Sequence, residues 1–487
     1  MRRRLFSRWR AWATVGSLLT GCGGVERGHA AAIRVPEQVA GVQAAINLAQ
    51  AGDTVVIDRG TYAGGLIITG KAITLASRYI ETGDSADISH TLISGGNTLL
   101  TIDSTAKPTT TIRGLTFLDG SYQIENYARR VNILDNHFIG GGADQMSFEG
   151  AGGVVRGCLF ERAGDDAIDC DEASDPIIED NIILNPGDDG IELRLHPYTG
   201  SLLQIVFRNN VFSGCTEDGI QLIDYAGMSS RDFLIQGNVF VNNLKVGLAC
   251  MANGNTIENY LGAALVEPVR VIGNTFCGNP YGVTGGDDML LMNNIIVGCT
   301  QVGAKRLATS SLASHNDFWK NTTNYVSTNI DAASTVLSDP RLETDYTLQD
   351  GSPCIDAGAV SMEWNGKKVS AGNYLGMAPD LGAHESSGGS LVSVGPPAAA
   401  RMTLATVRPN PASGAVAIAF TLAESAAARI ELMDLAGRRI LVRELGALDR
   451  GSHVVRLPEA RGLATGVYLV RLVQGDRSLS TPMIIAR

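Results

Sequence analysis

Residues 205–212 read Ile205-Val-Phe-Arg-Asn-Asn-Val-Phe212, and 28 residues later the chain reads Phe233-Leu-Ile-Gln-Gly-Asn-Val-Phe240. The shared pattern is an apolar run, then an asparagine, then Phe or Ile two positions further on. It recurs at steps of 20 to 36 residues, and a second short apolar run such as Gly219-Ile220 follows each copy. Short strands at such a step, with insertions absorbed at one turn, are typical of a solenoid. The repeated positions are Asn136, Cys158, Asn181, Asn210, Asn238, Asn274, Asn294 and Asn316.

This repeat predicts an all-β protein whose body is a right-handed parallel β-helix. Each coil would bury its inward Ile, Val and Phe side chains against the next coil and form hydrogen bonds to it across about 4.8 Å. The recurring asparagine is predicted at an inward turn, where stacked amides satisfy one another and the left-handed backbone region is tolerated. A β-sandwich also has many strands, but it would not repeat one motif eight times in phase.

Both ends of the repeat resemble those of pectin-lyase-like right-handed β-helix proteins. Val35-Pro36-Glu37, an amphipathic stretch over 39–50 and Gly52-Asp53-Thr54-Val55-Val56-Ile57 resemble the start of these proteins, where a helix caps the first coil. Segments 352–358 and 379–385 resemble the closing part of bacterial surface β-helices. The resemblance covers 33–385 and implies an architecture without naming a substrate.

The first 22 residues resemble a bacterial lipoprotein signal peptide. A basic start and a short apolar stretch precede Leu19-Thr20-Gly21-Cys22. The apolar stretch is too short for a transmembrane helix. The resemblance implies that residues 1–22 direct export and that Cys22 is lipidated and becomes the mature N-terminus. We therefore expect a lipoprotein of the cell envelope, in the outer membrane or at the cell surface, attached to the membrane through Cys22.

A second domain is predicted after a linker over 386–402, which is rich in Ser, Gly, Pro and Ala. Short alternating runs punctuated by glycine over 403–487 predict a small immunoglobulin-like β-sandwich. Arg408-Pro409-Asn410-Pro411 and Gly466-Val467-Tyr468-Leu469 resemble the C-terminal sorting domains of type IX secretion and the related domain of flagellar hook-capping proteins. The usual lysine before the final strand is absent, so we interpret this domain as a docking or export module.

The formal net charge of −11 is distributed unevenly along the chain. Residues 23–402 hold 23 Lys and Arg against 43 Asp and Glu, whereas 403–487 hold 11 Arg against 7 acids. An acidic body repels nucleic acid and attracts cations, so nucleic-acid binding is not expected. Seven cysteines remain after Cys22, without zinc spacing or a CxxC pair, and we interpret Cys215 and Cys299 as buried fillers. Their disulfide state is left open by the sequence.

Two columns of acids follow from aligning four consecutive repeats. Carboxylates on adjacent coils would lie roughly 5 Å apart and repel by about 3 kcal/mol per pair at an effective dielectric of about 20. A divalent cation, raised pKa values or nearby arginines would relieve this repulsion, and oxygen-only ligands favour Ca²⁺. The predicted Ca²⁺ ligands are Asp144, Asp166, Asp189 and Asp218 in the first column and Asp165, Asp188 and Glu217 in the second.

Three interpretations of these columns remain open: solvated acidic turns, a structural or ligand-bridging Ca²⁺ site, and an active site for polysaccharide. Asp144 followed by Asp165-Asp166 is similar in spacing to the acids of polygalacturonase-type hydrolases, whose Gly-His-Gly and Arg-x-Lys motifs are absent here. Pectate-lyase-type chemistry needs Ca²⁺ and a basic residue, for which Arg194 is the candidate and His196 the runner-up. The candidate catalytic residues are Asp165, Asp166, Asp188, Asp189 and Arg194.

These observations predict an exported, monomeric protein that binds acidic or neutral polysaccharide along its β-helix. Cleavage by Ca²⁺-assisted elimination is the first candidate activity, ahead of polygalacturonase-type hydrolysis. The alternative is a non-catalytic adhesion or scaffold protein in which the acids hold structural Ca²⁺. Redox-metal handling is disfavoured because the sequence has no His and Met clusters.

Overall fold

The structure is a computed structural model of the 487-residue chain. It describes residues 31–386 apart from 228, 253 and 255–264, and in the C-terminal part 391–392, 402–404, 407, 412, 416–422, 426–433, 438–448, 451–464, 466–475 and 477–485. The predictions for Cys22, for the signal peptide and for most of the linker concern residues outside these ranges. The chain forms two compact units: one holds the coils up to Cys354 together with Leu381–His384, and the other holds Ile355–Asp380 and Glu385–Arg487.

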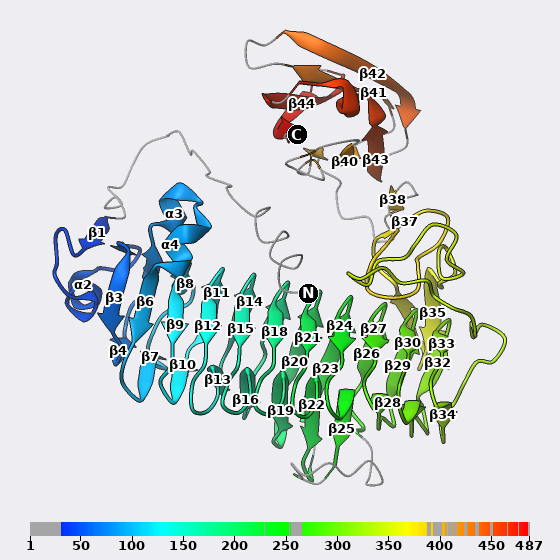
Figure 1. The fold of residues 1–487 in the computed structure, drawn as a ribbon, viewed down its shortest axis with the longest axis horizontal. Helices are drawn as coiled ribbons and strands as arrows, with labels where there is room; N and C mark the ends of the chain where they lie inside the picture. The colour runs from blue at the N-terminus through cyan, green and yellow to red at the C-terminus, as the bar shows by residue number, and fades with distance from the viewer. Residues whose placement is uncertain are drawn as a thin grey trace. The chain divides into compact units, whose positions relative to one another are not determined.

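The first unit is a right-handed parallel β-helix, as predicted. Its coils stack on one another and form three long sheets, here named A, B and C. In each sheet the strands of successive coils pair in parallel (Figure 1). Sheet A comprises β1 (Ala32–Val35), β2 (Thr54–Ile57), β5 (Thr74–Ser77), β8 (Thr111–Arg113), β11 (Arg129–Leu134), β14 (Gly152–Arg156), β17 (Ile177–Glu179), β20 (Tyr198–Arg208), β23 (Ser229–Gln236), β26 (Val269–Ile272), β29 (Met289–Met292) and β32 (Leu312–Ser314).

Sheets B and C each contain 11 strands. Sheet B comprises β3 (Gly60–Ala63), β6 (Thr91–Ser94), β9 (Thr116–Leu118), β12 (His137–Ile139), β15 (Leu159–Glu161), β18 (Ile182–Leu184), β21 (Val211–Ser213), β24 (Val239–Val241), β27 (Thr275–Cys277), β30 (Ile295–Val297) and β33 (Asp317–Trp319). Sheet C comprises β4 (Leu66–Ile68), β7 (Thr98–Ile102), β10 (Tyr122–Asn126), β13 (Met146–Glu149), β16 (Ile168–Asp171), β19 (Ile191–Leu195), β22 (Ile220–Asp224), β25 (Val246–Met251), β28 (Tyr281–Thr284), β31 (Val302–Lys305) and β34 (Thr323–Val326).

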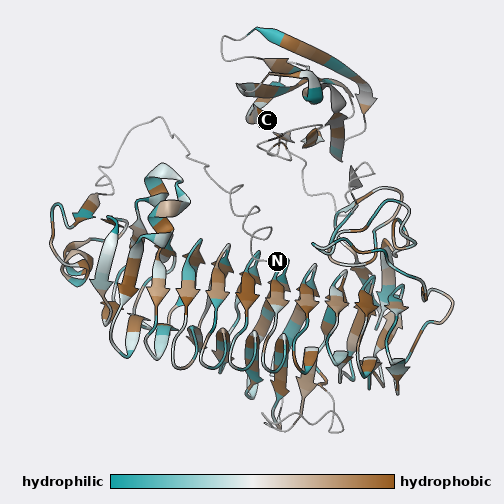
Figure 2. Ribbon diagram, viewed as in Figure 1, coloured by the Kyte–Doolittle hydropathy of each residue, from teal (hydrophilic) through white to brown (hydrophobic). Residues whose placement is uncertain are grey.

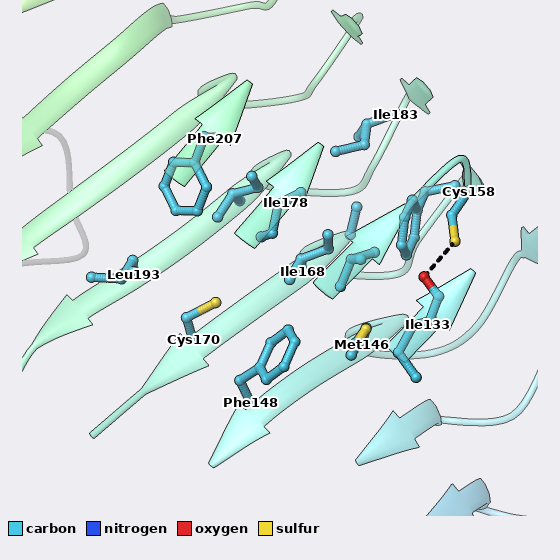
Figure 3. Packing of buried hydrophobic residues seen from close by; sticks show 14 of the residues in the cluster. Ile133, Met146, Phe148, Cys158, Ile168, Cys170, Ile178, Ile183, Leu193 and Phe207 are labelled. Carbon is cyan, nitrogen blue, oxygen red and sulfur yellow. Dashed lines mark hydrogen bonds between the residues drawn. The ribbon is translucent and has the colours of Figure 1, made fainter. Parts of the chain in front are cut away.

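The core lies between the three sheets, because every strand turns alternate side chains inward. Hydrophobic residues recur along the strands of the coils (Figure 2). Residues such as Met146, Ile168 and Phe207 are fully buried in one continuous cluster (Figure 3). Phenylalanines at one position of sheet B stack from coil to coil, with the ring centroids of Phe138 and Phe160 4.5 Å apart. This burial of apolar surface stabilises the solenoid.

The repeated asparagines form an inward ladder of hydrogen bonds. The backbone N–H of Asn181 donates to Oδ1 of Asn210 on the next coil at 3.0 Å, and Nδ2 of Asn181 donates to the carbonyl oxygen of Val155 at 3.0 Å. The prediction that stacked amides satisfy one another is confirmed. The left-handed backbone conformation occurs one residue earlier than predicted, at Asp180 (φ 58°) and Asn209 (φ 55°), because the turn precedes the ladder residue.

A short helix protects the first coil, as predicted. Helix α2 (Val42–Leu48) lies beside β4, the first strand of sheet C. The side chain of Gln43 forms the backbone hydrogen bonds that a neighbouring strand would otherwise form. Its Nε2 donates to the carbonyl oxygen of Ile67 at 3.1 Å, and its Oε1 accepts from the N–H of Ile67 at 2.7 Å. The exposed sheet edge is therefore hydrogen-bonded by a side chain. Two further helices, α3 (Tyr79–Thr82) and α4 (Ser85–Ser89), lie in the turn between β5 and β6.

The second unit contains two hairpins and an antiparallel domain. The hairpins pair β35 (Ser361–Trp364) with β36 (Lys367–Ser370) and β37 (Tyr374–Leu375) with β38 (Leu391–Val392). The domain has a sheet of β39 (Thr403–Leu404), β40 (Val416–Leu422) and β43 (Gly451–Leu457), and a sheet of β42 (Arg439–Leu448), β41 (Ala426–Met433), β44 (Gly466–Gln474) and β45 (Arg477–Ile485), with η2 (Pro458–Gly462) between β43 and β44. Two antiparallel sheets around one core agree with the predicted immunoglobulin-like domain.

Among the described residues, the seven cysteines after Cys22 form no disulfide bond, and six of them are buried. Cys215 and Cys299 lie in the core of the β-helix, as predicted for buried fillers. Of the described residues, no helix is long and apolar enough to cross a membrane.

Candidate functional site

The first acidic column lies at the turn that enters sheet C, two residues before the start of each strand. Each aspartate accepts a backbone N–H from the same position on the next coil, so the column is a ladder of carboxylates. Oδ1 of Asp144 accepts from Asp166 at 3.2 Å, Oδ1 of Asp166 from Asp189 at 2.8 Å, Oδ1 of Asp189 from Asp218 at 2.7 Å, and Oδ1 of Asp218 from Val246 at 2.7 Å. The alignment that predicted this column matches the observed strand register.

Most of this column is removed from solvent. The exposed fractions of Asp166, Asp189 and Asp218 are 5%, 1% and 0%. Burial raises the pKa of Asp166 well above its usual value, and the charges of Glu192 and Asp144 add to the effect. Burial likewise raises the pKa of Asp189, with further contributions from Asp218 and Asp166. For the half-buried Asp144, burial raises the pKa to about 6. Ionised carboxylates are therefore costly at this turn without a counter-charge.

The second column is more accessible to solvent. Asp165 is exposed, and Asp188 and Glu217 are half-buried. On the next coil the corresponding residue is Lys245, whose ammonium pairs with the carboxylate of Glu217. The second column therefore ends in an ion pair, which was not predicted from the sequence.

Further acids project from the outer face of sheet C beside these columns. Side chains alternate along β16 and β19, so that Ile168 and Cys170 point into the core while Asp169 and Asp171 face outward. Three sets of carboxylates have ligand oxygens within 4.8 Å of one another, and Asp166 and Asp169 each belong to two of them. The sets are Asp165, Asp166 and Asp188; Asp166, Asp169 and Glu192; and Glu149, Asp169 and Asp171. We name these seven residues the acidic patch.

Arg194 lies within the acidic patch and pairs with three of its carboxylates. Its Nη1 lies 3.4 Å from Oδ1 of Asp169 and 3.3 Å from Oδ1 of Asp171, and its Nη2 contacts Oε1 of Glu192. Burial disfavours the guanidinium charge, but these carboxylates outweigh burial and raise the pKa of Arg194. The arrangement stabilises Arg194 as a cation, which makes it a counter-charge for the patch and disfavours proton abstraction by it.

The acidic patch holds more carboxyl groups than Arg194 can balance. Burial raises the pKa of Asp169 to about 8, with a further contribution from the charge of Asp171. Burial also raises the pKa of Glu192 to about 7, although the charge of Arg194 opposes the change. Near neutral pH these groups must therefore bind protons or another cation.

The donors of the acidic patch fit Ca²⁺. Calcium takes six to eight oxygen ligands at about 2.3–2.6 Å, so oxygens that share one ion lie at most about 5 Å apart. The three overlapping sets meet this limit with carboxylate oxygens alone. Asp165, Asp166 and Asp188 would hold an ion nearest to solvent, and Asp169 and Glu192 would extend the site toward Arg194.

Three of the seven predicted ligands are thus brought together, namely Asp165, Asp166 and Asp188. Asp144, Asp189 and Asp218 lie in the ladder and belong to none of the three sets found among the described residues, and Glu217 pairs with Lys245. The predicted ligands did not include Glu149, Asp169, Asp171 and Glu192. The sequence did contain an indication of these ligands, because each of them occupies an outward position of a strand that follows an acidic turn.

His196, the second candidate base, lies at the edge of the patch. Its Nδ1 is 3.3 Å from the backbone nitrogen of Glu172, which donates to it. Its ring lies against the ring of Tyr225, with centroids 4.5 Å apart. His196 is therefore engaged by a backbone donor and an aromatic neighbour.

Two parts of the chain match known protein families. Residues 98–261, which contain the acidic patch, match the right handed beta helix region. Residues 406–486 match the secretion system C-terminal sorting domain, which marks a protein for export to the cell surface or the exterior. Among curated proteins, no match to the chain is found.

Several solved β-helix structures are similar to this chain. Pectate lyase Pel9A is 18% identical, with a TM-score of 0.41, over 71% of this chain and 90% of its own. The A-module of mannuronan C-5 epimerase AlgE4 from Azotobacter vinelandii is 14% identical, with a TM-score of 0.41, over 59% and 88%. The PL6 family alginate lyase AlyGC is 12% identical, with a TM-score of 0.35, over 66% and 56%. At these identities and TM-scores, the likenesses say nothing about what this chain binds.

The parallel coils and both family matches lead to one conclusion about the architecture. The chain contains a right-handed parallel β-helix, and residues 406–486 match the C-terminal sorting domain of a secretion system.

Proposed function

We propose that this protein is an exported β-helix protein that binds acidic polysaccharide through Ca²⁺ at the acidic patch. The observation that carries the proposal is that three carboxylate sets, drawn from adjacent coils, overlap at Asp166 and Asp169. Such crowding of like charges is costly unless a cation is bound. Bound Ca²⁺ supplies the positive charge that the patch needs and open coordination positions for anionic groups of a ligand.

An acidic ligand is favoured by the location of the patch. Asp165 is exposed and Asp188 half-buried, so an ion at this end would remain accessible to a polymer in solution. The strongly acidic body would repel a polyanion in the absence of cations. Binding of a uronate polymer should therefore require the divalent ion. In this proposal the residues of the patch hold the cation, Arg194 balances the remaining charge, and Cys22 attaches the protein to the membrane.

The experiment measures polymer binding with and without the ion. Purified full-length protein is titrated with polygalacturonate and with alginate in Ca²⁺ and in chelator, with a neutral glucan as control. We expect binding of at least one uronate polymer in Ca²⁺, its loss in chelator, and no binding of the glucan. Binding that is insensitive to chelator would contradict the role of the ion, and absence of uronate binding would contradict the proposed function.

The non-catalytic adhesion or scaffold function differs from this proposal in one observable respect. A structural ion would raise the melting temperature of the protein without any uronate binding. Cleavage of the polymer is a separate question, which substitutions of Arg194 can answer.

A further inference from the structure

Tyrosines lie at both ends of the acidic patch along the axis of the β-helix. At one end is Tyr127, one residue after β10, with 40% of its surface exposed. The register of β10 with β13 and of β13 with β16 places Tyr127 in line with Glu149 and Asp171 on the next two coils. Tyr127 therefore continues, on the coil before the patch, a row of outward acidic side chains.

At the other end is Tyr225, one residue after β22. Its ring packs against His196 at a centroid distance of 4.5 Å and a tilt of 51°. It also borders a small apolar cluster of Ile223, Val246, Ala249 and Met251, which is separate from the main core. At this coil, the residues that border the acidic patch are therefore aromatic and apolar.

Both rings are electrostatic neighbours of the acidic patch. Burial raises the pKa of Tyr127, and the charges of Glu125 and Glu149 add to this. Burial also raises the pKa of Tyr225, where Arg194 and Asp171 have opposite effects. The interaction between two charges weakens as their separation grows, so both tyrosines lie near the acidic side chains named here. The two tyrosines and the acidic patch therefore belong to one continuous surface of sheet C.

We propose that Tyr127 and Tyr225 are stacking platforms for sugar rings and hold an internal stretch of polysaccharide along the helix axis, across the acidic patch. The inference rests on the proposed function and extends it to the length and orientation of the ligand. An aromatic ring presents an apolar face and a polar edge, which suits a sugar ring whose carbon face is apolar and whose rim is polar.

The spacing of the tyrosines selects an oligosaccharide over a single sugar. β10 and β22 are four strand steps apart in sheet C, which amounts to roughly 19 Å at about 4.8 Å per step. Sheet C continues for two strands beyond β10 and for four beyond β22. A polymer lying along the sheet can therefore extend past both tyrosines, and the site does not require a chain end.

The test compares uronate oligosaccharides of increasing length, in saturating Ca²⁺, on wild type and on single variants. For wild type, affinity should rise with length until the ligand spans both rings and then level off. Tyr127→Ala and Tyr225→Ala should each weaken binding of long ligands by about fivefold. Tyr127→Phe and Tyr225→Phe keep the ring and should stay within about twofold. A control outside the acidic patch is Tyr325→Ala, since Tyr325 is 38% exposed on β34 of the same sheet, where its ring contacts Phe318.

Melting in Ca²⁺ and in chelator is measured for every variant, so that loss of a ring is separated from loss of the ion site or of the fold. Alanine variants that bind long ligands as tightly as wild type overturn this inference alone. The same holds if wild type binds short and long ligands equally well. A wild-type protein that binds no uronate oligosaccharide overturns both this inference and the proposed function.

Discussion

Oδ1 of Asp166 accepts a hydrogen bond from the backbone N–H of Asp189, 2.8 Å away on the following coil. In the asparagine ladder the direction is opposite: the N–H of Asn181 donates to Oδ1 of Asn210 on the following coil at 3.0 Å. One solenoid thus carries two polar ladders of opposite direction. The amide ladder is uncharged, whereas the carboxylate ladder accumulates negative charge unless protons or cations bind.

This difference separates the structural role of Asp166 from its role as a ligand. Asp166→Asn keeps the oxygen that accepts from Asp189 but removes a charge from two of the three carboxylate sets. We expect the variant to fold and to melt in chelator at or above the wild-type temperature, because repulsion falls. Ca²⁺ at a hundredfold excess over Kd should stabilise wild type by about 2.7 kcal/mol, and the variant by much less.

The control for this prediction is Asp180→Asn, which removes a half-buried carboxylate in the turn between sheets A and B, outside the acidic patch. Its melting temperature should respond to Ca²⁺ as wild type does. Equal responses in wild type and Asp166→Asn would contradict the assignment of Asp166 as a ligand. Wild-type melting that is insensitive to both chelator and Ca²⁺ would contradict the site as a whole.

In chelator, stability should depend on pH because Asp169 and Glu192 have raised pKa values. Their folded-state values are about 8 and about 7, whereas unfolded Asp and Glu ionise near about 4. The folded state therefore binds more protons than the unfolded state between about pH 4 and 8, and stability falls as pH rises through this window. We expect the melting temperature to decrease from pH 5 to about pH 8, as measured by calorimetry.

Two variants assign this pH dependence. Asp169→Asn removes one titrating group from the patch and should flatten the curve in chelator. Asp317→Asn removes a carboxyl outside the patch, whose pKa burial raises to about 7, and should flatten the curve without changing the response to Ca²⁺. Stability that rises from pH 5 to 8 in chelator would have the wrong sign for buried, protonated acids.

The fold could be predicted from the sequence because one physical constraint repeats many times. Every coil needs inward apolar residues at a period of two and a turn that satisfies its own polar groups. Strand β40 (Val416–Leu422) of the C-terminal domain shows the same alternation, with every second residue buried. The helices α3 and α4 were missed, since each is a single turn whose sequence lacks a helical period. The position of the left-handed residue was off by one, because the motif identifies the ladder but not the preceding turn.

The site could be predicted only in part. The repeat gave the register and so the two columns, but it did not indicate which acids share a cation. Asp169 and Asp171 stand on a strand, where alternation of sides places Asp169 close to the oxygens of both Glu149 and Glu192 and Asp171 close to those of Glu149. The pairing of Lys245 with Glu217 depends on side-chain reach across a coil step. Whether two side chains on neighbouring coils come into contact depends on their conformations, which the repeat does not encode.

The asparagine ladder has one irregular step, and it offers a stabilising substitution. Cys158 Sγ lies 3.6 Å from the carbonyl oxygen of Ile133. On the next coil the equivalent contact is a 3.0 Å hydrogen bond from Nδ2 of Asn181 to the carbonyl oxygen of Val155. Figure 3 shows the contact of Cys158 with Ile133 in the core. In Cys158→Asn the amide can donate to Ile133 and accept from Asn136, so we expect unfolding to cost about 1 kcal/mol more.

The control is the same substitution at Cys170, which is fully buried between apolar side chains away from the ladder. An amide without partners there should destabilise the protein by about 1–3 kcal/mol. Chemical denaturation measures both variants. If Cys158→Asn were destabilised as much as Cys170→Asn, the ladder could not accept an amide at this coil.

Membrane attachment through Cys22 is tested by Cys22→Ser. Lipidation at Leu19-Thr20-Gly21-Cys22 would anchor the exported protein, and the substitution removes the thiol that is acylated. We expect wild type in the membrane fraction and the variant in the soluble fraction, with equal total protein. An N-terminus mapped downstream of Cys22, with unchanged fractionation, would contradict lipidation and leave export to the C-terminal sorting domain.

Arg194 distinguishes a charge-balancing role from a catalytic one. Arg194→Ala leaves Asp169, Asp171 and Glu192 without their cation, which should lower the melting temperature in chelator. Saturating Ca²⁺ should restore most of this loss, because the ion replaces the missing positive charge. Arg194→Lys keeps a charge without the fork of the guanidinium, and its melting temperature should fall between those of wild type and Arg194→Ala.

The same variants test cleavage by elimination. Wild type, Arg194→Lys and Arg194→Ala are incubated with polygalacturonate and alginate in Ca²⁺, and unsaturated uronate is followed by its ultraviolet absorbance. The three ion pairs hold Arg194 protonated, so we expect it to act as a counter-charge and no variant to differ from wild type in product formation at saturating Ca²⁺. Product that forms with wild type and disappears with both variants, while Ca²⁺ still raises their melting temperatures, would instead identify Arg194 as the base of a lyase.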